Sequence, residues 1–260
     1  MAEPLPSQGV QTVAETAEAG APPLWRHAEL AAELPWLVQG TTGRGRDADM
    51  GLFGALPVGR AMERWHGLRE RFGMPRMVHA RQVHGTRVLR HEDHTPGLLI
   101  QDAADGHHTA APGILLTVST ADCVPVFLVD EDARAVALLH AGWRGVAGGM
   151  LEAGARALAA LGGGPEGWRV HFGPAICGPC YEVGPEVHAA LGLPEPAAPT
   201  PVDLRAYLAR KAVALGVPPA RVSISTHCTR CDGQHFYSHR GGNPERQISV
   251  LGIRPGAAGT

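Results

Sequence analysis

The sequence predicts one α+β domain built around a mixed or antiparallel sheet. Short runs of strand character are combined with a few segments of helical apolar spacing. No internal repeat is visible, and strand-like runs stand on both sides of the proline-rich stretch 193–201. We therefore expect that stretch to be a surface loop and residues 24–260 to form a single domain.

The first part of the chain predicts little regular structure. Residues 1–23 are rich in Ala, Glu, Pro and Gly and show no apolar periodicity. Because they cannot bury enough surface to offset the entropy of ordering, we predict a disordered tail there. Residues 40–54 are glycine-rich and contain Arg44 and Arg46, which indicates a loop.

The remaining chain contains the predicted regular elements. One helix is indicated by four apolar residues at helical spacing: Met62, Trp65, Leu68 and Phe72. Two more helices are expected over about 146–161 and 204–215. Strands are expected over 77–83, 86–89, 114–118, 124–129, 134–140, 169–172, 221–225 and 247–253.

Charge and hydropathy exclude several classes of partner. The formal net charge of -2 at pH 7 gives no electrostatic footprint for nucleic acid or an anionic membrane. The start, Met1-Ala2-Glu3-Pro4, is acidic where a secretory signal is basic, so we expect a cytoplasmic protein. The most apolar stretch, 114–129, is interrupted by Asp122 and Pro125, so no membrane span is expected. We expect a monomer with a small-molecule partner.

Five cysteines and 14 histidines make metal chemistry worth testing. An odd number of cysteines in a chain without an export signal argues against a disulfide framework. Free thiols, metal ligands and catalytic groups are the roles that remain. For any single histidine, an ordinary surface or core position is the simpler interpretation.

A predicted hairpin brings two of these residues together. Residues 124–129 and 134–140 have strand character, and Asp130-Glu131-Asp132-Ala133 between them is a polar turn. With that turn, Cys123 lies directly opposite His140, with Cβ atoms about 4.5–5.5 Å apart. A thiolate and an imidazole at this separation suit one zinc ion. The alternative is a small buried cysteine and a satisfied histidine at a strand end.

The segment after His140 favours a functional role for the pair. Ala141-Gly142-Trp143-Arg144-Gly145 is turn-like, carries a guanidinium and precedes a helix. A third candidate ligand is His84, which lies between two strand-like runs. Three protein ligands would leave the fourth zinc position to water or substrate, as in a catalytic site.

The other cysteines form two Cys-x-x-Cys pairs, Cys177 with Cys180 and Cys228 with Cys231. Together they could form a structural four-cysteine zinc site. Their separation along the chain far exceeds that of a compact zinc ribbon. We therefore predict that they do not jointly hold a second metal and are free thiols near a pocket.

Taken together, these residues resemble those of the YfiH family, variously called the polyphenol oxidase, laccase-domain or purine nucleoside phosphorylase family. The resemblance covers residues 82 to about 253. It rests on motifs in a fixed order: Gln82-Val83-His84-Gly85, Thr120-Ala121-Asp122-Cys123, His140-Ala141-Gly142-Trp143-Arg144-Gly145, Gly173-Pro174-Ala175-Ile176, Tyr181-Glu182-Val183-Gly184 and Cys228-Thr229-Arg230-Cys231.

The resemblance implies a three-layer α/β fold around a mixed, largely antiparallel sheet, with His84, Cys123 and His140 as zinc ligands. Family members are associated with phosphorolysis of adenosine, inosine and methylthioadenosine, and with adenosine deamination. Copper-dependent phenol oxidation and removal of wrongly built peptidoglycan precursors have also been attached to members. The implied partners are purine nucleoside and phosphate, with zinc as the cofactor and copper as the alternative metal.

Before Gln82 the chain departs from the family pattern. Relatives carry Thr-Arg-x-Gly-Gly, whereas this chain has Thr41-Thr42-Gly43-Arg44-Gly45, with the arginine displaced by one position. Arg44 and Gln82 are the candidates for substrate contacts from these two motifs.

Further candidates follow from the two nucleoside reactions. Asp122 is either a proton carrier in deamination or a turn residue bonded to backbone. Arg144 and Arg240 suit bidentate contacts to phosphate, or are solvated surface arginines. Tyr181 and Phe236 can stack on a purine or pack in the core. The non-enzymatic alternative is a zinc-stabilised binding module.

Overall fold

The computed structural model describes residues 9–54 and 56–256, which form a mixed α/β structure with two stacked seven-stranded sheets. The strands of the first sheet are β1 (Gln11–Val13), β6 (Val88–Arg90), β8 (Gly106–Thr109), β10 (Val124–Asp130), β11 (Ala135–Ala141), β12 (Trp168–Phe172) and β15 (Val222–Ser225). Those of the second are β2 (Thr16–Glu18), β3 (Leu24–Arg26), β4 (Leu37–Thr42), β5 (Arg76–Ala80), β7 (Gly97–Gln101), β9 (Ile114–Thr120) and β16 (Gln247–Ile253). The predicted α/β class is confirmed, with two sheets in place of one.

Both sheets are mixed. Their strand orders are β1-β15-β12-β10-β11-β8-β6 and β2-β3-β4-β16-β9-β5-β7. Antiparallel pairs such as β10 with β11 and β9 with β16 occupy their centres, and parallel pairs such as β12 with β15 and β5 with β7 lie toward the edges. A parallel pair needs a long crossover, so residues distant in sequence meet at these edges.

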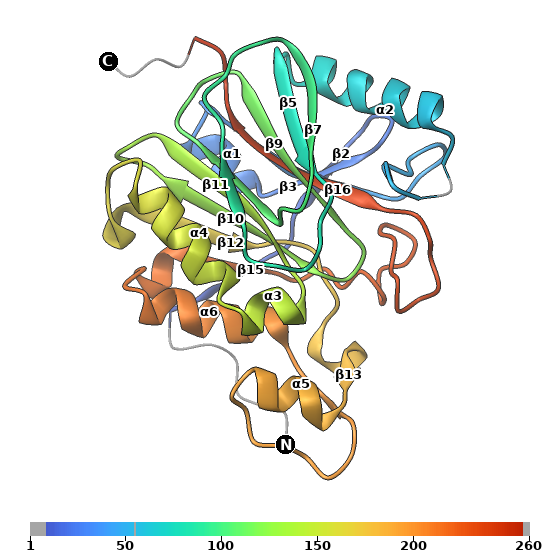
Figure 1. Ribbon diagram of the computed structural model, residues 1–260, viewed down its shortest axis with the longest axis vertical. Helices are drawn as coiled ribbons and strands as arrows, with labels where there is room; N and C mark the ends of the chain where they lie inside the picture. The colour runs from blue at the N-terminus through green and yellow to red at the C-terminus, as the bar shows by residue number, and fades with distance from the viewer. Residues whose placement is uncertain (1–8, 55, 257–260) are drawn as a thin grey trace.

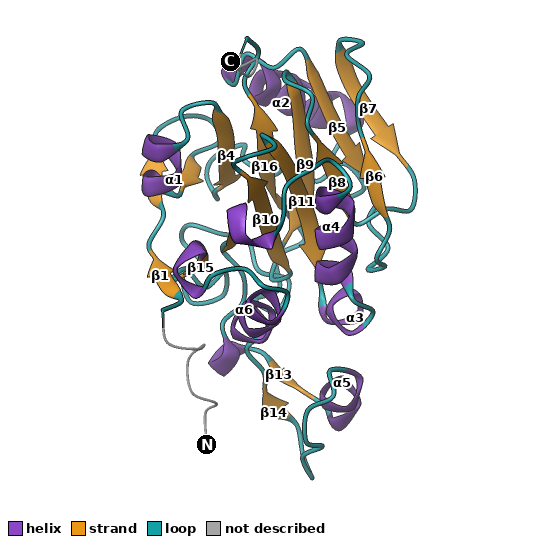
Figure 2. Cartoon of the chain, turned by 90° about the vertical axis from the view of Figure 1, so that its left-hand side faces the viewer, coloured by secondary structure: helices purple, strands orange, loops and turns teal. Residues whose placement is uncertain are grey.

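Of the six α-helices among the described residues, four cover the outer faces of the two sheets: α2 (Val58–Arg71), α3 (Trp143–Ala147), α4 (Met150–Ala159) and α6 (Leu204–Ala214). The other two are α1 (Ala28–Glu33), whose Leu30 packs in the cluster between the sheets, and α5 (Pro185–Ala190). Figure 1 shows α2 on one side of the strands and α3, α4 and α6 on the other. A short ladder of β13 (Glu182–Val183) and β14 (Thr200–Pro201) extends with α5 beyond α6 (Figure 2). No helix among the described residues is long and apolar enough to cross a bilayer.

The central hairpin is apolar on both faces because both faces are buried. Phe127 and Val136 pack toward the second sheet, in one cluster with Ile114 and Leu116 of β9. Leu128, like Val124 and Val126, points to the opposite side of the strand and faces α4 and α6. The alternation follows from the two-residue period of a strand.

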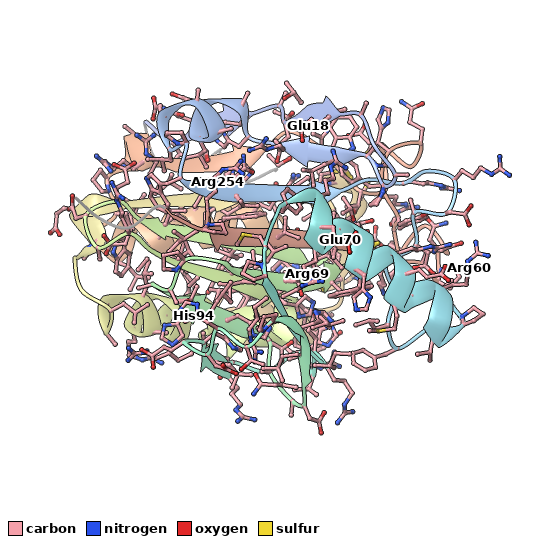
Figure 3. The ribbon with its side chains drawn as sticks, turned by 90° about the horizontal axis from the view of Figure 1, so that it is seen from above. Glu18, Arg60, Arg69, Glu70, His94 and Arg254 are labelled. Carbon is pink, nitrogen blue, oxygen red and sulfur yellow. The ribbon has the colours of Figure 1, made fainter. Side chains whose placement is uncertain are left out.

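The helix α2 has one buried and one exposed face. Trp65 and Leu68 pack against the outer face of the second sheet, and Trp65 Nε1 donates to the carbonyl of Met50. Arg60 and Glu70 lie on the exposed face (Figure 3). The helix predicted from this spacing is therefore confirmed.

The helix predicted over 146–161 is divided in two. It appears as α3 and α4, separated at Gly148 and Gly149. Gly149 has a φ of 88°, a left-handed conformation that glycine adopts without steric cost and that cannot continue a right-handed helix. The helix predicted over 204–215 matches α6, and the predicted strands match observed ones within a few residues.

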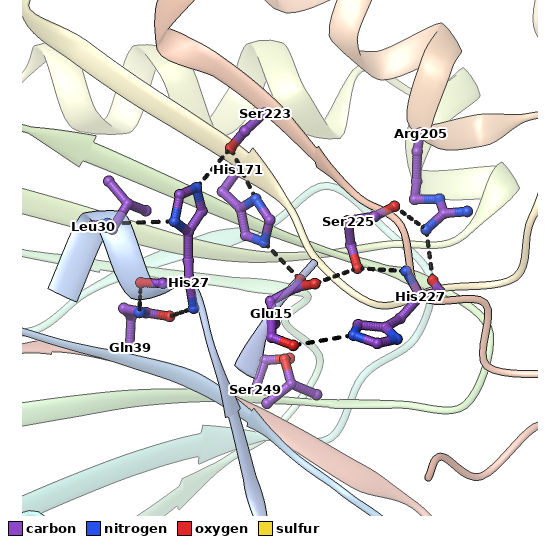
Figure 4. A network of polar contacts seen from close by, with 11 residues as sticks. Glu15, His27, Leu30, Gln39, His171, Arg205, Ser223, Ser225, His227 and Ser249 are labelled. Atoms are coloured by element: carbon purple, nitrogen blue, oxygen red, sulfur yellow. Dashed lines mark hydrogen bonds and ion pairs between the residues drawn. The ribbon is translucent and has the colours of Figure 1, made fainter. Parts of the chain in front are cut away.

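The predicted disordered tail is wrong for residues 11–18, while residues 1–8 lie outside the described part of the chain. β1 pairs with β15 and β2 pairs with β3. Between them, the buried Glu15 accepts hydrogen bonds from His171 Nε2 at 2.9 Å and from Ser225 Oγ at 2.7 Å (Figure 4). Backbone pairing and a buried polar network thus order a segment that lacks apolar periodicity.

Candidate metal site and pocket

A pocket of about 580 Å³ lies where the ends of β5, β9 and β11 approach one another. Residues 121–123 connect β9 of the second sheet to β10 of the first, so the chain passes between the sheets at this point. The wall is completed by the loop after β4 and by the segment before β16. The stacking of the sheets therefore creates the pocket.

The structure brings His84, Cys123 and His140 together in the pocket wall. Their possible ligand atoms all lie within 4.8 Å of one another, and Cys123 Sγ is 3.9 Å from His84 Nε2. The two imidazole rings cross at 77° with their centroids 4.8 Å apart. His140 is buried, Cys123 half-buried and His84 exposed, so the cluster opens toward the pocket.

The hairpin register differs from the predicted one. Asp130 continues β10 and pairs with Ala135, so the turn is formed by residues 131–134. Asp130 stays in the strand because its carboxylate accepts hydrogen bonds from Trp168 Nε1 and from a turn amide. As a result Pro125, not Cys123, lies opposite His140. The shift is two residues, which keeps Cys123 on the same side as His140.

Asp105, just before β8, holds the cluster of candidate ligands in place. Its carboxylate is fully buried and accepts hydrogen bonds from His140 Nδ1 at 2.9 Å and from the amides of residues 83, 84 and 85. The His84 amide bond stabilises a left-handed backbone with a φ of 59°. A carboxylate that fixes one nitrogen of a histidine leaves the other nitrogen oriented for a metal.

Two pKa shifts describe the charge state of the cluster. Burial raises the pKa of Cys123. The charge of His140 and hydrogen bonds from both histidines together outweigh burial and lower this pKa to about 6. Burial lowers the pKa of His140, but the charge of Cys123 and the hydrogen bond to Asp105 raise it to about 9. Cys123 is therefore a thiolate at neutral pH, the form that binds metals.

Gly142 allows the cluster to close. A Cβ at this position would lie 2.8 Å from His84 Cδ2 and 3.0 Å from Cys123 Sγ. Any side chain would therefore separate two of the three donors. The turn-like segment 141–145 therefore contributes a glycine that lets His84 and Cys123 approach each other, in addition to the guanidinium of Arg144.

Asp122 adopts the arrangement of the turn alternative. Its φ is 95°, and its side chain is buried. Oδ1 accepts a hydrogen bond from Thr229 Oγ1 at 2.6 Å, and Oδ2 accepts one from the Arg240 amide at 2.7 Å. The carboxylate thus connects the β9–β10 junction to two later loops.

Arginine side chains dominate the charge of the pocket. Four arginines line it: Arg81, Arg144, Arg240 and Arg246. Asp122 is the one carboxylate residue among the described residues of the lining. Arg144 and Arg240, two candidates for phosphate contacts, are thus in the wall, whereas Arg44 is not part of it. The Arg44 guanidinium donates to the Gly233 carbonyl and lies 5.7 Å from the Tyr237 ring centroid.

The remaining predicted contacts divide between wall and core. Gln82 lines the pocket but uses its amide on the Ser119 backbone, donating from Nε2 at 2.8 Å and accepting at Oε1 at 2.7 Å. Tyr181 lines the pocket beneath Arg240, whose guanidinium lies 5.3 Å from the ring centroid. Burial is the main reason why the pKa of Tyr181 is raised to about 12. Phe236 is fully buried, the core alternative.

Several residues of the site were not among the candidates from the sequence, including Asp105, Phe53, Arg81 and Arg246. Phe53 is 58% exposed, lines the pocket and stacks on His79 with ring centroids 6.1 Å apart. The only sequence signal for Asp105 is an Asp-Gly step before a short histidine-containing run. An aromatic residue in a glycine-rich loop was the available signal for Phe53.

The four remaining cysteines also come together, although their separation along the chain was the reason for predicting no joint metal site. Cys177, Cys180, Cys228 and Cys231 have sulfur atoms that all lie within 4.8 Å of one another. The spacing rule of a zinc ribbon applies to ligand pairs that lie close together in the sequence. These two pairs instead follow the neighbouring parallel strands β12 and β15. A crossover through α6 accounts for the long separation.

Known proteins are similar to this chain in sequence. A family model described as "Multi-copper polyphenol oxidoreductase laccase" matches residues 59–254. "Adenosine deaminase RL5", from an unknown prokaryotic organism, is 38% identical over 181 residues, which cover 63% of this chain and 69% of the relative. "Purine nucleoside phosphorylase YlmD" of Geobacillus stearothermophilus is 35% identical over 209 residues, which cover 70% of this chain and 74% of the relative.

Solved structures have the same fold. The crystal structure of YlmD from Geobacillus stearothermophilus matches with a TM-score of 0.81 and 28% identity, covering 92% of this chain and 99% of that chain. The Bacillus licheniformis hypothetical protein YfiH matches with a TM-score of 0.82 and 23% identity over the same shares. The second likeness concerns the fold alone.

Proposed function

The chain belongs to the multi-copper polyphenol oxidoreductase laccase family, and from this premise we propose that it is a zinc-dependent enzyme acting on purine nucleosides. One observation carries the proposal. Three metal-compatible donors, from His84, Cys123 and His140, lie in the wall of a pocket that four arginines line. The relatives named purine nucleoside phosphorylase and adenosine deaminase support this substrate class.

The donor set fits one zinc ion. Two imidazoles and one thiolate are among the ligand combinations of catalytic zinc sites, and three protein donors leave one position open. The hydrogen bond from His140 Nδ1 to Asp105 fits this use, because it leaves the other ring nitrogen for the metal. When bound, zinc would supply Lewis acidity and lower the pKa of a water toward neutrality.

The chain's own residues would bind and orient the substrates. Arg144 is the best-placed group for phosphate. Its exposed guanidinium lies 4.3 Å from the Trp143 ring centroid and makes no hydrogen bond to another described residue. Arg240 already donates to the Glu182 carbonyl, so its guanidinium is held in a fixed place at the wall. Fixed guanidinium forks suit bidentate contacts to phosphate oxygens.

Phe53 and Tyr181 offer aromatic faces for a purine. Phe53 is exposed within the wall, and Tyr181 is half-buried there. Aromatic rings in offset contact contribute about 0.5–1.5 kcal/mol beyond area burial. A pocket of about 580 Å³ lies within the usual range for small-molecule sites.

Two reactions use this arrangement differently. Phosphorolysis transfers the ribosyl group to phosphate and releases free base, so it requires the arginines. Deamination replaces the purine amine with oxygen from water and releases ammonia, so it requires no phosphate. Asp122 is a positioning residue in both, because its two oxygens are occupied by Thr229 and Arg240.

The test is an assay of metal-defined protein on adenosine, inosine and methylthioadenosine, with and without phosphate. We expect base release to depend on phosphate and ammonia release to proceed without it. Both should disappear when the metal is removed and return with zinc. Absence of both products from zinc-replete protein would overturn the proposal.

Phenol oxidation is the second candidate, because the description of the matched family specifies a copper polyphenol oxidoreductase. A thiolate with two imidazoles is also a donor set that copper accepts. The same protein is loaded with copper and assayed for phenol-dependent oxygen consumption. Activity there, together with no turnover of nucleosides, would replace the nucleoside proposal.

A further inference from the structure

A cluster of four cysteines lies outside the pocket, and we propose that it binds a second, structural zinc ion. The cluster consists of Cys177, Cys180, Cys228 and Cys231. The sulfur of Cys231 lies 3.4 Å from that of Cys180 and 4.0 Å from that of Cys177. None of the four is in a disulfide.

The separations fit one tetrahedral ion. Zinc–sulfur bonds of about 2.3 Å in a tetrahedron place the sulfurs about 3.8 Å apart. The observed pairs bracket that value, and all four sulfurs lie within 4.8 Å of one another. Four protein sulfurs fill the coordination sphere and leave no position for substrate, which is the arrangement of a structural site.

Backbone amides point at the most buried sulfur. Cys228 Sγ accepts hydrogen bonds from the Cys177 amide at 3.3 Å and from the Cys231 amide at 3.4 Å. Such donors stabilise negative charge on sulfur and orient it, as supporting contacts do around metal ligands. The second bond runs from residue 231 back to residue 228, so the turn itself prepares the ligand.

The fold brings both pairs to the same edge before any metal binds. β12 and β15 are parallel neighbours, and an isolated bridge between Ala175 and Cys228 extends their pairing to the cluster. Asp232 Oδ2 accepts from the Cys228 amide at 3.1 Å, which fixes the second turn. A site with preformed geometry costs little ordering when the ion binds.

The second zinc would join a segment of the pocket wall to a loop that supports the wall. Tyr181 directly follows Cys180, and Thr229 directly follows Cys228. Thr229 donates to Asp122, whose other oxygen holds the Arg240 amide. The inferred ion is therefore a structural support for the pocket, and it requires no particular substrate.

Metal analysis of four proteins tests the inference: wild type, Cys123→Ala, Cys180→Ser/Cys231→Ser, and all three substitutions combined. We expect about two zinc ions per wild-type chain, about one in each partial variant and almost none in the combined variant. About one zinc in the wild type, located by Cys123→Ala at the pocket, would overturn the inference. Full zinc retention in the double serine variant would do so as well.

Cobalt substitution distinguishes the two sites spectroscopically. Thiolate-to-cobalt charge-transfer absorption grows with the number of sulfur ligands, so Cys123→Ala should retain most of it. Cys180→Ser/Cys231→Ser should retain only the weak contribution of one thiolate. The reverse distribution would assign the strong sulfur site to the pocket and contradict the inference.

Wild-type protein supplies a test that does not require folded variants. We expect all four thiols of the cluster to resist alkylation until a chelator is added, and then to react. Alkylation of all four without chelator would overturn the inference. So would a Cys180–Cys231 disulfide found by mass spectrometry of freshly isolated, zinc-replete protein, or iron in place of zinc.

Discussion

His140 and His171 are both buried histidines paired with a carboxylate, yet they lie in very different surroundings. His140 Nδ1 is 2.9 Å from Asp105, and His171 Nε2 is 2.9 Å from Glu15. The other nitrogen of His171 meets Ser223 Oγ at 2.9 Å inside the core (Figure 4). His140 instead shares a cluster with a thiolate cysteine and an exposed histidine at the pocket.

The comparison shows that a histidine–carboxylate pair does not by itself indicate chemistry. The neighbour of the second nitrogen decides. A serine that completes a buried hydrogen-bond network gives rigidity, because every polar group is satisfied. A sulfur donor and a second imidazole nitrogen beside a pocket instead form a group of ligands that is able to bind a metal. Substitutions at the two pairs should therefore have separate effects on metal binding and on stability.

Replacing His140 should remove the pocket metal and with it the activity. For His140→Ala we expect nucleoside turnover to fall by on the order of 10³-fold, because the metal loses a ligand and the cluster its geometry. The readouts are zinc content and turnover of the purified variant. His171→Ala is the matched control for a lost histidine–carboxylate pair, and its zinc content should match wild type. Zinc loss in both variants would show that the two pairs are not distinct.

Asp105→Asn should weaken the site without removing a ligand. An amide can still accept one hydrogen bond, but it has no negative charge to pair with His140. Changes to such supporting residues typically cost 10–100-fold in metal affinity or activity. Competition with a chelator measures the zinc affinity. Unchanged affinity would remove Asp105 from its positioning role.

Local patterns in the sequence predicted part of this site, and long-range pairing decided the rest. The two strand-like runs that became β10 and β11, separated by a polar turn, predicted a hairpin that brings Cys123 near His140. Its register depended on whether Asp130 belongs to the turn, and the contacts of the Asp130 carboxylate with Trp168 and with a turn amide decide that. A shift of two residues keeps a side chain on the same face of the strand. The predicted proximity of Cys123 and His140 therefore holds although the predicted register was wrong.

Other features had no local signal. The position of Glu15 depends on partners more than 150 residues away in the chain, so a tail without apolar periodicity was predicted to be disordered. The two Cys-x-x-Cys pairs meet through a parallel pairing that no spacing rule describes. Composition and periodicity report burial along one element, whereas sites arise where several elements meet.

Glu15→Gln should affect stability and leave turnover per folded molecule unchanged. The carboxylate accepts hydrogen bonds from His171 and from Ser225 inside the core. Weakening a buried charge-assisted contact should lower the free energy of unfolding by about 2 kcal/mol. Urea unfolding measures it, and zinc content is the control. A loss of zinc in this variant would mean that the second pair also supports the pocket.

Arg144→Ala tests whether the pocket beside the His140–Asp105 pair binds an anion. We expect the KM for phosphate to rise about tenfold, equivalent to about 1.4 kcal/mol, with deamination little changed. Arg44→Ala is the matched control, because Arg44 is absent from the pocket lining. Equal effects of the two substitutions on the KM for phosphate would contradict the assigned position of the anion.

Acid should weaken the core network through His27, which joins it by a contact of 3.4 Å between Nε2 and Ser223 Oγ. Burial first, and then the charge of His171, lowers the pKa of His27 to about 4 from its usual 6.5. The unfolded chain therefore takes up a proton at His27 below about pH 6.5, whereas the folded chain does not until near pH 4. The contribution of His27 to stability is complete above pH 6.5 and declines as the pH falls through that window.

His27→Asn isolates this effect, because asparagine can replace the Nδ1 atom that accepts the Leu30 amide at the start of α1 without titrating. Between pH 6.5 and pH 4 we expect wild type to lose roughly 1 kcal/mol more unfolding free energy than the variant. The pKa of the neighbouring Glu15 is also lowered, so it acts in the same direction at lower pH and is common to both proteins. Urea unfolding at several pH values measures the difference. Parallel curves would mean that His27 titrates alike in the folded and unfolded chains, and the acid dependence would then have to arise from other groups.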